Sequence, residues 1–126
     1  MSSESDPSVE DAREPLERLY DDPDRQIQEL LEHRLEENAL AGKHAVFQAL
    51  ANKDRLRLLE ALRHDERCGC ELMVILDAPQ STVSTHLRKL REAGLVKNRK
   101  KGKWNYYRIA DPAVMDILDL AAAVSE

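Results

Sequence analysis

Two cysteines separated by a single glycine form the segment of this chain that is best suited to binding a soft ion. Cys68 and Cys70 are the only cysteines in the sequence, and they flank Gly69. Thiolates are the protein ligands that soft metal ions prefer. Two of them are too few for a closed zinc site, so a further ligand would come from a histidine or from a second copy of the chain. Met73 offers a thioether, although a methionine in an apolar segment more often fills the core.

The spacing of the two thiols also predicts how a bound ion would act on the chain. Residues i and i+2 of an α-helix point about 200° apart. If residues 68–76 are helical, both thiolates can reach one ion only when the first turn unwinds, and Gly69 lowers the cost of that distortion. The distorted turn leads through residues 77–80 into a basic helix. The ion and a binding partner of that helix would therefore be negatively coupled.

This basic helix opens a block whose charge and side chains suit DNA. Residues 80–108 carry nine Lys or Arg side chains and one acidic side chain, Glu92. The positive charge of such a block would attract a polyanion, although a run of charges by itself is also typical of a solvent-exposed surface. Short polar side chains at the start of a helix suit the major groove, and one of Ser81 and Thr82 is expected to cap the helix. The predicted DNA contacts are Gln80, Ser81, Thr82, Ser84, Thr85 and Arg88 on the helix and Arg99, Lys100, Lys101 and Lys103 at the tip beyond it.

The elements that must position these side chains follow from the periodicity of the apolar residues. Residues 70–76 and 81–93 are predicted to be two short helices joined by a tight turn, and Gly94 suits the left-handed residue that ends the second helix. Residues 95–99 and 104–109 are predicted to be strands with a basic tip between them. A helix-turn-helix followed by a hairpin is a winged helix. The expected fold is therefore mainly α with a small β-hairpin wing.

The rest of the chain is expected to supply an extension and a dimer interface. Residues 1–22 begin with a stretch rich in Ser, Asp and Glu and are predicted to be an acidic, disordered extension. Residues 23–126 are predicted to be the DNA-binding domain, with apolar dimerisation helices at both ends, the first of which Gly42 would bend or break. The first 40 residues have a net charge of −9 and the remainder +4.

The composition excludes several classes of protein. A length of 126 residues suits one domain, and no apolar run approaches the roughly 18 residues that a membrane span needs. The first residues lack the layout of a signal peptide, and two cysteines cannot form a disulfide framework. The expected protein is therefore cytoplasmic and has no membrane segment. Its four histidines are scattered and no paired-carboxylate motif is visible, so neither an enzyme nor a permanent cofactor is expected.

The chain resembles the arsenical-resistance (ArsR/SmtB) family of metal-responsive repressors over about residues 46–110. The resemblance rests on the runs FQALANKDRLRLLEAL, CGCEL, QSTVSTHLRKLREAGLV and RKKGKWNYYRI. It implies a homodimeric winged helix that binds double-stranded operator DNA and leaves it when an inducer binds. It also implies that His86 lies near the DNA backbone, whereas packing of this histidine against the helix and the wing is the alternative.

The same resemblance makes the CGCEL segment an inducer site for arsenite, antimonite or another thiophilic ion. Several arsenic-responsive members carry a third cysteine where this chain has Met73, and the family's other metal site is missing because residues 112–124 contain no histidine. The hypothesis is a repressor of a metal(loid)-resistance operon, released when trivalent arsenic or antimony binds Cys68 and Cys70. Three alternatives stay open: a sensor of cadmium, lead or zinc, a thiol redox switch that uses the same cysteines, and a winged helix that binds proteins instead of DNA.

Overall fold

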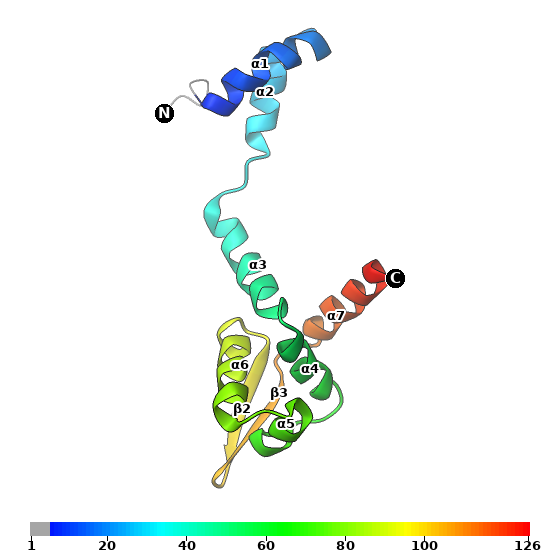
Figure 1. The fold of residues 1–126 in the computed structure, drawn as a ribbon. Coiled ribbons are helices and arrows are strands. Elements are labelled where there is room, and N and C mark those ends of the chain that lie inside the picture. The colour runs from blue at the N-terminus through cyan, green and yellow to red at the C-terminus, as the bar shows by residue number, and fades with distance from the viewer. Residues whose placement is uncertain (1–5) are drawn as a thin grey trace. The chain divides into compact units, whose positions relative to one another are not determined.

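Seven helices and one three-stranded antiparallel sheet make up the chain in the computed structural model, which describes residues 6–126 (Figure 1). This confirms the mainly helical fold with a small hairpin wing. None of the described helices is long and apolar enough to cross a membrane. The chain divides into two units, Met1–Leu40 and Ala41–Glu126, which are described one after the other.

The first unit contains two helices, α1 (Pro7–Leu19) and α2 (Pro23–Glu32). Each begins at a proline, whose fixed φ suits the first helical position, directly after an aspartate whose carboxylate accepts a backbone N–H. Val9 of α1 and Ile27 of α2 are buried and border one shared hollow. The disorder predicted for residues 1–22 is therefore wrong for the described part of that segment, because the acidic composition hides an amphipathic stripe. Residues 1–5 lie outside the described part.

Helix α3 (Glu37–Leu50) spans the boundary between the two units. The predicted break at Gly42 is wrong, since this residue lies inside α3 and the helical pattern is interrupted at residues 33–36 instead. Glycine in a helix interior costs only about 1 kcal/mol relative to alanine, which helix formers around it can offset. The apolar stripe is thus divided between two separate helices.

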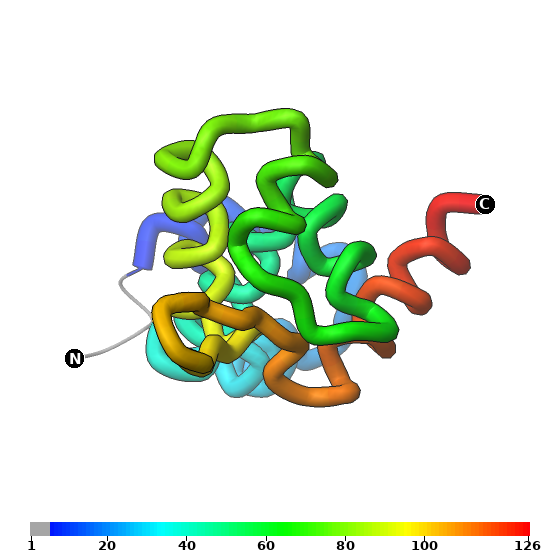
Figure 2. Tube along the Cα trace, turned by 90° about the horizontal axis from the view of Figure 1, so that it is seen from below, coloured from blue at the N-terminus to red at the C-terminus, as the bar shows by residue number. Residues whose placement is uncertain are grey.

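The second unit holds the predicted helix-turn-helix and wing. After the end of α3 come α4 (Lys53–Ala61), β1 (Arg67–Cys68), α5 (Gly69–Leu76), α6 (Gln80–Glu92), β2 (Val96–Lys101), β3 (Trp104–Ile109) and α7 (Pro112–Ser125). Figure 2 shows α5 and α6 side by side, joined by a short turn. Asp77 ends α5 in the left-handed region with φ 51°, and Gly94 follows α6 with φ 80°, as predicted for this glycine.

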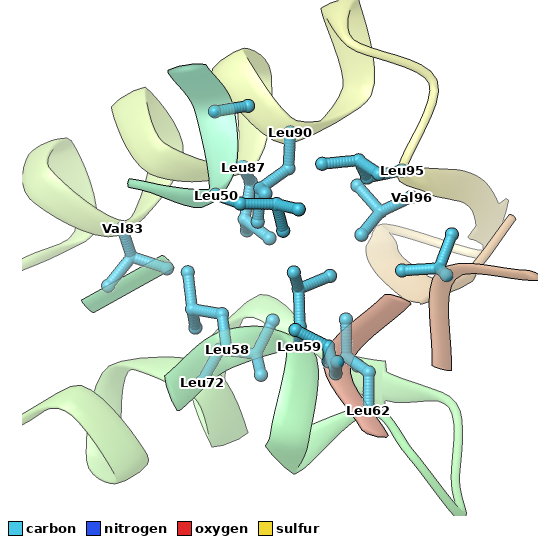
Figure 3. Close-up of a cluster of buried hydrophobic side chains, with 13 residues drawn as sticks. Leu50, Leu58, Leu59, Leu62, Leu72, Val83, Leu87, Leu90, Leu95 and Val96 are labelled. Carbon is cyan, nitrogen blue, oxygen red and sulfur yellow. The ribbon is translucent and has the colours of Figure 1, made fainter. Parts of the chain in front are cut away.

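Leucines from α4, α5 and α6 form the centre of the core of the second unit (Figure 3). Leu58, Leu59, Leu72 and Leu90 are fully buried. Truncating one such leucine to alanine typically costs 2–5 kcal/mol, about the scale expected here. The inner face of α6 is therefore held firmly, and its outer face is left for binding.

The sheet contains a strand that the sequence pattern does not reveal. Its order is β1-β3-β2, and both pairings are antiparallel. Cys68 of β1 lies opposite Tyr106 of β3, and Arg99 of β2 lies opposite the same tyrosine. Cys68, Tyr106 and Arg99 thus form one row across the sheet, which links the first thiol to the wing.

Candidate DNA interface and thiol pair

Helix α6 presents a polar face on the side opposite the core. Val83, Leu87 and Leu90 are buried, which turns the intervening positions outward because they differ by about 100° per residue. The predicted DNA-contacting side chains that are exposed on α6 are Gln80, Ser81, Thr82, Ser84, Thr85 and Arg88.

The polar residues at the start of α6 do not cap the helix. The N-cap position belongs to Pro79, and no side chain of the described residues makes a capping hydrogen bond there. The prediction that Ser81 or Thr82 caps the helix is therefore wrong. Thr85 donates its hydroxyl hydrogen to the Ser81 carbonyl at 2.9 Å. The remaining short polar side chains face outward, as a surface that reads the major groove requires.

His86 is placed differently from its neighbours on α6. Its side chain is only 15 % exposed, its Nδ1 lies 3.3 Å from Arg55 Nη1, and its Nε2 lies 3.9 Å from Asp54 Oδ2. Both partners belong to α4, so the ring packs on α4 rather than on the wing. This placement favours a role for His86 in holding α6 against α4.

Arg55 is a buried arginine beside α6 that the sequence reasoning missed. It is 8 % exposed, and its Nε donates to the Ala49 carbonyl at 2.6 Å. Its guanidinium thus connects the end of α3 with His86 of α6. A signal was available, because Arg55 stands three and four residues before the buried Leu58 and Leu59 and therefore on the same face of α4.

The hairpin between β2 and β3 carries the second group of predicted DNA contacts. Lys100, Lys101 and Lys103 are exposed, and Lys103 Nζ lies 5.4 Å above the Trp104 ring. Arg99 is engaged within the protein, since its Nη2 donates to Glu66 Oε1 at 2.6 Å. Hydrogen bonds from Arg99 lower the pKa of the Glu66 carboxyl. Three lysines at the tip are therefore presented to a polyanion, and Arg99 is held by a carboxylate.

The two thiols lie in different elements. Cys68 ends β1 and is the N-cap residue of α5, with extended φ −77° and ψ 162°, while Cys70 is exposed in the first turn of α5. The condition considered for the sequence, that residues 68–76 are all helical, is therefore not met at Cys68, and the helix begins one residue before the predicted start at residue 70. An ion that draws the thiols together would displace the extended segment at Cys68, because that residue lies outside the helix.

Glu71 holds the extended segment in place. The Cys68 N–H donates to Glu71 Oε1 at 3.0 Å. Hydrogen bonds from the backbone and side chain of Cys68 lower the pKa of the Glu71 carboxyl, and the Arg67 guanidinium adds to this effect. Cys68 is thus both the capping residue of α5 and the last residue of β1.

Among the described residues, no histidine or carboxylate completes a three-ligand group with the two thiols. Among residues 6–126, no three His, Cys, Asp or Glu side chains lie close enough together to hold a metal ion. Met73 is half-buried and packs against the core, although with Cys70 it borders a hollow of about 300 Å³. Gln80 and Ser84 of α6 and Lys103 and Trp104 of the wing line the same hollow. Cys70 therefore lines a hollow together with both elements that are predicted to contact DNA, α6 and the wing.

Comparisons with known proteins identify a matching family and several relatives. Residues 52–98 match the model of the family described as bacterial regulatory protein, arsR family. The chain is 36 % identical over 81 residues to the cadmium resistance transcriptional regulatory protein CadC of Listeria innocua, covering 64 % of this chain and 68 % of that protein. It is 46 % identical over 65 residues to the arsenic resistance transcriptional regulator ArsR1 of Pseudomonas putida, covering 51 % of each.

A solved structure shows the same fold. The homodimeric winged helix-turn-helix DNA-binding domain Mb0332 from Mycobacterium bovis superposes with a TM-score of 0.67 at 32 % identity. The match covers 74 % of this chain and 88 % of that chain. The structural match therefore covers a larger share of the chain than the family model, which matches residues 52–98.

Proposed function

Because the chain belongs to the arsR family of bacterial regulatory proteins, we propose that it is a homodimeric repressor that a thiophilic ion releases from operator DNA. Its relatives are DNA-binding transcriptional regulators, not enzymes. The observation that carries the proposal is the position of Cys68 and Cys70 at the N-terminus of α5. This is the helix that leads through one short turn into α6.

The proposed DNA contacts divide into two kinds. Gln80, Ser84 and Arg88 of α6 would meet base edges in the major groove, and Ser81, Thr82 and Thr85 would contact bases or phosphates beside them. Lys100, Lys101 and Lys103 of the wing would contact the phosphate backbone. The packing of His86 on α4 and the pairing of Arg99 with Glu66 support positioning roles for these two residues.

The proposed dimer would use apolar surface that the second unit leaves uncovered. Phe47 of α3 is 62 % exposed, and Leu120 and Val124 of α7 are 67 % and 87 % exposed. Large exposed apolar side chains on two helices support burial against a second copy. A dimer with two-fold symmetry would place its two α6 helices in half-sites of the DNA about 34 Å apart. Sedimentation at micromolar concentration tests this, and a mass of 14.4 kDa would contradict it.

Trivalent arsenic or antimony is the proposed inducer, with Cys68 and Cys70 as its ligands. Two thiolates that belong to no three-ligand group of His, Cys, Asp or Glu among the described residues suit an ion that prefers sulfur, and a second copy would supply any further donor. Cadmium, lead or zinc is the competing proposal, and relatives named for cadmium and for arsenic both match the chain. Oxidation of the pair is less favoured, because a ring closed over one residue is strained and readily reduced.

The test is release of palindromic promoter DNA, followed by fluorescence anisotropy with reductant present. Arsenite, antimonite, cadmium, lead and zinc are titrated separately, so that the ion giving release at the lowest concentration identifies the inducer class. Cys68→Ser and Cys70→Ser should keep DNA binding and lose release, because serine is a poor ligand for soft ions. Met73→Leu is the matched control and should change release little if Met73 belongs to the core. Normal release of Cys68→Ser by every ion would refute the proposed inducer site.

A further inference from the structure

A single carboxylate reaches from the segment before β1 to the wing. Arg99 Nε donates to both Glu66 oxygens at 3.0 and 2.9 Å, and Nη2 donates to Oε1 at 2.6 Å. Bidentate guanidinium–carboxylate pairs of this length are among the stronger charge-assisted hydrogen bonds. Residues 93–110 hold six basic and no acidic side chains. Among the described residues, Glu66 is the one carboxylate that pairs with a cation of this stretch.

This bridge runs parallel to a connection through the sheet. Glu66 stands two residues before Cys68, and Cys68 is in register with Tyr106 and, through it, with Arg99. Neighbouring strands are about 4.8 Å apart, so Cys68 and Arg99 lie roughly 10 Å apart across β3. The bridge and the sheet row together tie the backbone at Cys68 to the backbone of β2.

The segment that carries Glu66 and Cys68 is the easiest part of the sheet to displace. Strand β1 has only two residues, whereas β2 and β3 pair over six residues each. Short elements with few backbone hydrogen bonds open at low free-energy cost. An ion that draws Cys68 toward Cys70 would move this edge strand before it moves the hairpin.

We propose that Glu66 is the positioning residue through which an ion at the thiol pair controls the wing. Displacement of Cys68 carries Glu66 away from Arg99, and the wing then loses this tie to the segment before β1. This inference rests on the proposed function and adds a route to DNA that does not pass through the turn into α6. Exposed ion pairs add little to stability, so the bridge matters chiefly for coupling.

The test compares Glu66→Gln with Glu60→Gln. Glu60 of α4 pairs with Arg63, and neither residue belongs to the sheet or the wing, so the Glu60 variant controls for the loss of one negative charge. Trp104 is the only tryptophan, lies at the start of β3 and is 47 % exposed, so its fluorescence reports on the wing. The full chain is titrated with arsenite and with cadmium chloride in reductant, and ion affinity is measured independently from thiolate absorbance.

The expected result separates ion binding from its consequence. Glu66→Gln should bind each ion with an affinity within about twofold of the original chain. In this variant, the change in Trp104 fluorescence on adding the ion should be at least about fivefold smaller than in the original chain. The factor by which the ion weakens DNA binding should also be at least about fivefold smaller, which is the lower end of typical allosteric coupling. Glu60→Gln should behave like the original chain. The exchanged pair Glu66→Arg with Arg99→Glu should recover much of the Trp104 response, because it restores the bridge.

Failure of this inference differs from failure of the proposed function. An unchanged Trp104 response in Glu66→Gln, or no response in the original chain, would overturn the inference whatever happens to DNA. An exchanged pair that stays unresponsive would assign the effect to charge rather than to the bridge and would also overturn it. A Trp104 response that depends on Glu66, without DNA release by any ion, would refute the proposed function and support the inference.

Discussion

Replacing Arg55 by methionine tests whether a buried guanidinium holds α6 in its reading position. Methionine keeps much of the apolar stem and removes the donors. The donor to the Ala49 carbonyl lies at 2.6 Å, and the contacts to His86 Nδ1 and the Gln48 carbonyl are longer, at 3.3 and 3.4 Å. One hydrogen bond from a charged group contributes about 1.5–3 kcal/mol, and the longer contacts add less. We expect Arg55→Met to lower the free energy of unfolding by about 2–4 kcal/mol.

The matched control is Arg57→Met on the same helix. Arg57 is 59 % exposed and, within residues 6–126, pairs only with Asp54 three residues away, so its loss should cost well under about 1 kcal/mol. Urea unfolding of the full chain, followed by circular dichroism at fixed protein concentration, gives both values. The melting temperature should fall by roughly 10–25 °C for Arg55→Met. If the two variants differ by less than about 0.5 kcal/mol, the proposed connection from α3 to α6 through Arg55 is refuted.

Lys101→Ala should weaken binding to all DNA sequences alike and reduce the slope of log affinity against log salt concentration by about one unit. Arg88→Ala should weaken binding to the operator alone, by about 1–3 kcal/mol. Equal behaviour of the two variants in binding assays at several salt concentrations would contradict the separate roles proposed for the wing and α6. Asp77→Gly should raise the free energy of unfolding by up to about 1 kcal/mol and Asp77→Val should lower it, since φ is 51° there; a more stable valine variant in urea would count against this. Hydrogen bonds from Ser8 and Arg34 lower the pKa of Asp6 from 3.8 to about 2. Its contribution to the first unit is therefore present above about pH 4 and lost as the pH falls toward 2. Asp6→Asn should show less acid-induced loss of ellipticity over that range, and an unchanged acid titration would argue against it.

The helix-turn-helix and the hairpin were predictable because their apolar periodicities are strong and local. The alternation of buried Val83, Leu87 and Leu90 with outward polar residues marks α6, and Gly94 marks its end. Gly102 has φ 64° at the turn before β3, a strand rich in aromatic and β-branched residues, so the hairpin was also visible.

Contacts between distant segments were not predictable from one sequence. β1 has two residues, which is too short for an alternating pattern, so the extended conformation of Cys68 was missed. Glu66 and Arg99 are 33 residues apart, and nothing local marks them as partners. The helix at 7–19 was missed for another reason, because the acidic residues that suggest disorder also cover the exposed face of an amphipathic helix.

The start of α6 has a consequence for the thermodynamics of operator binding. Pro79 provides no side-chain cap, and its carbonyl accepts the amides of Thr82 and Val83. The amides of Gln80 and Ser81, the first two of the helix, have no carbonyl partner within α6. A backbone phosphate placed there would complete the helix terminus and meet the positive end of its dipole. Operator DNA would then act as the missing cap. Slower hydrogen exchange at Gln80 and Ser81 in the complex would show that part of the binding free energy is the free energy of ordering this turn.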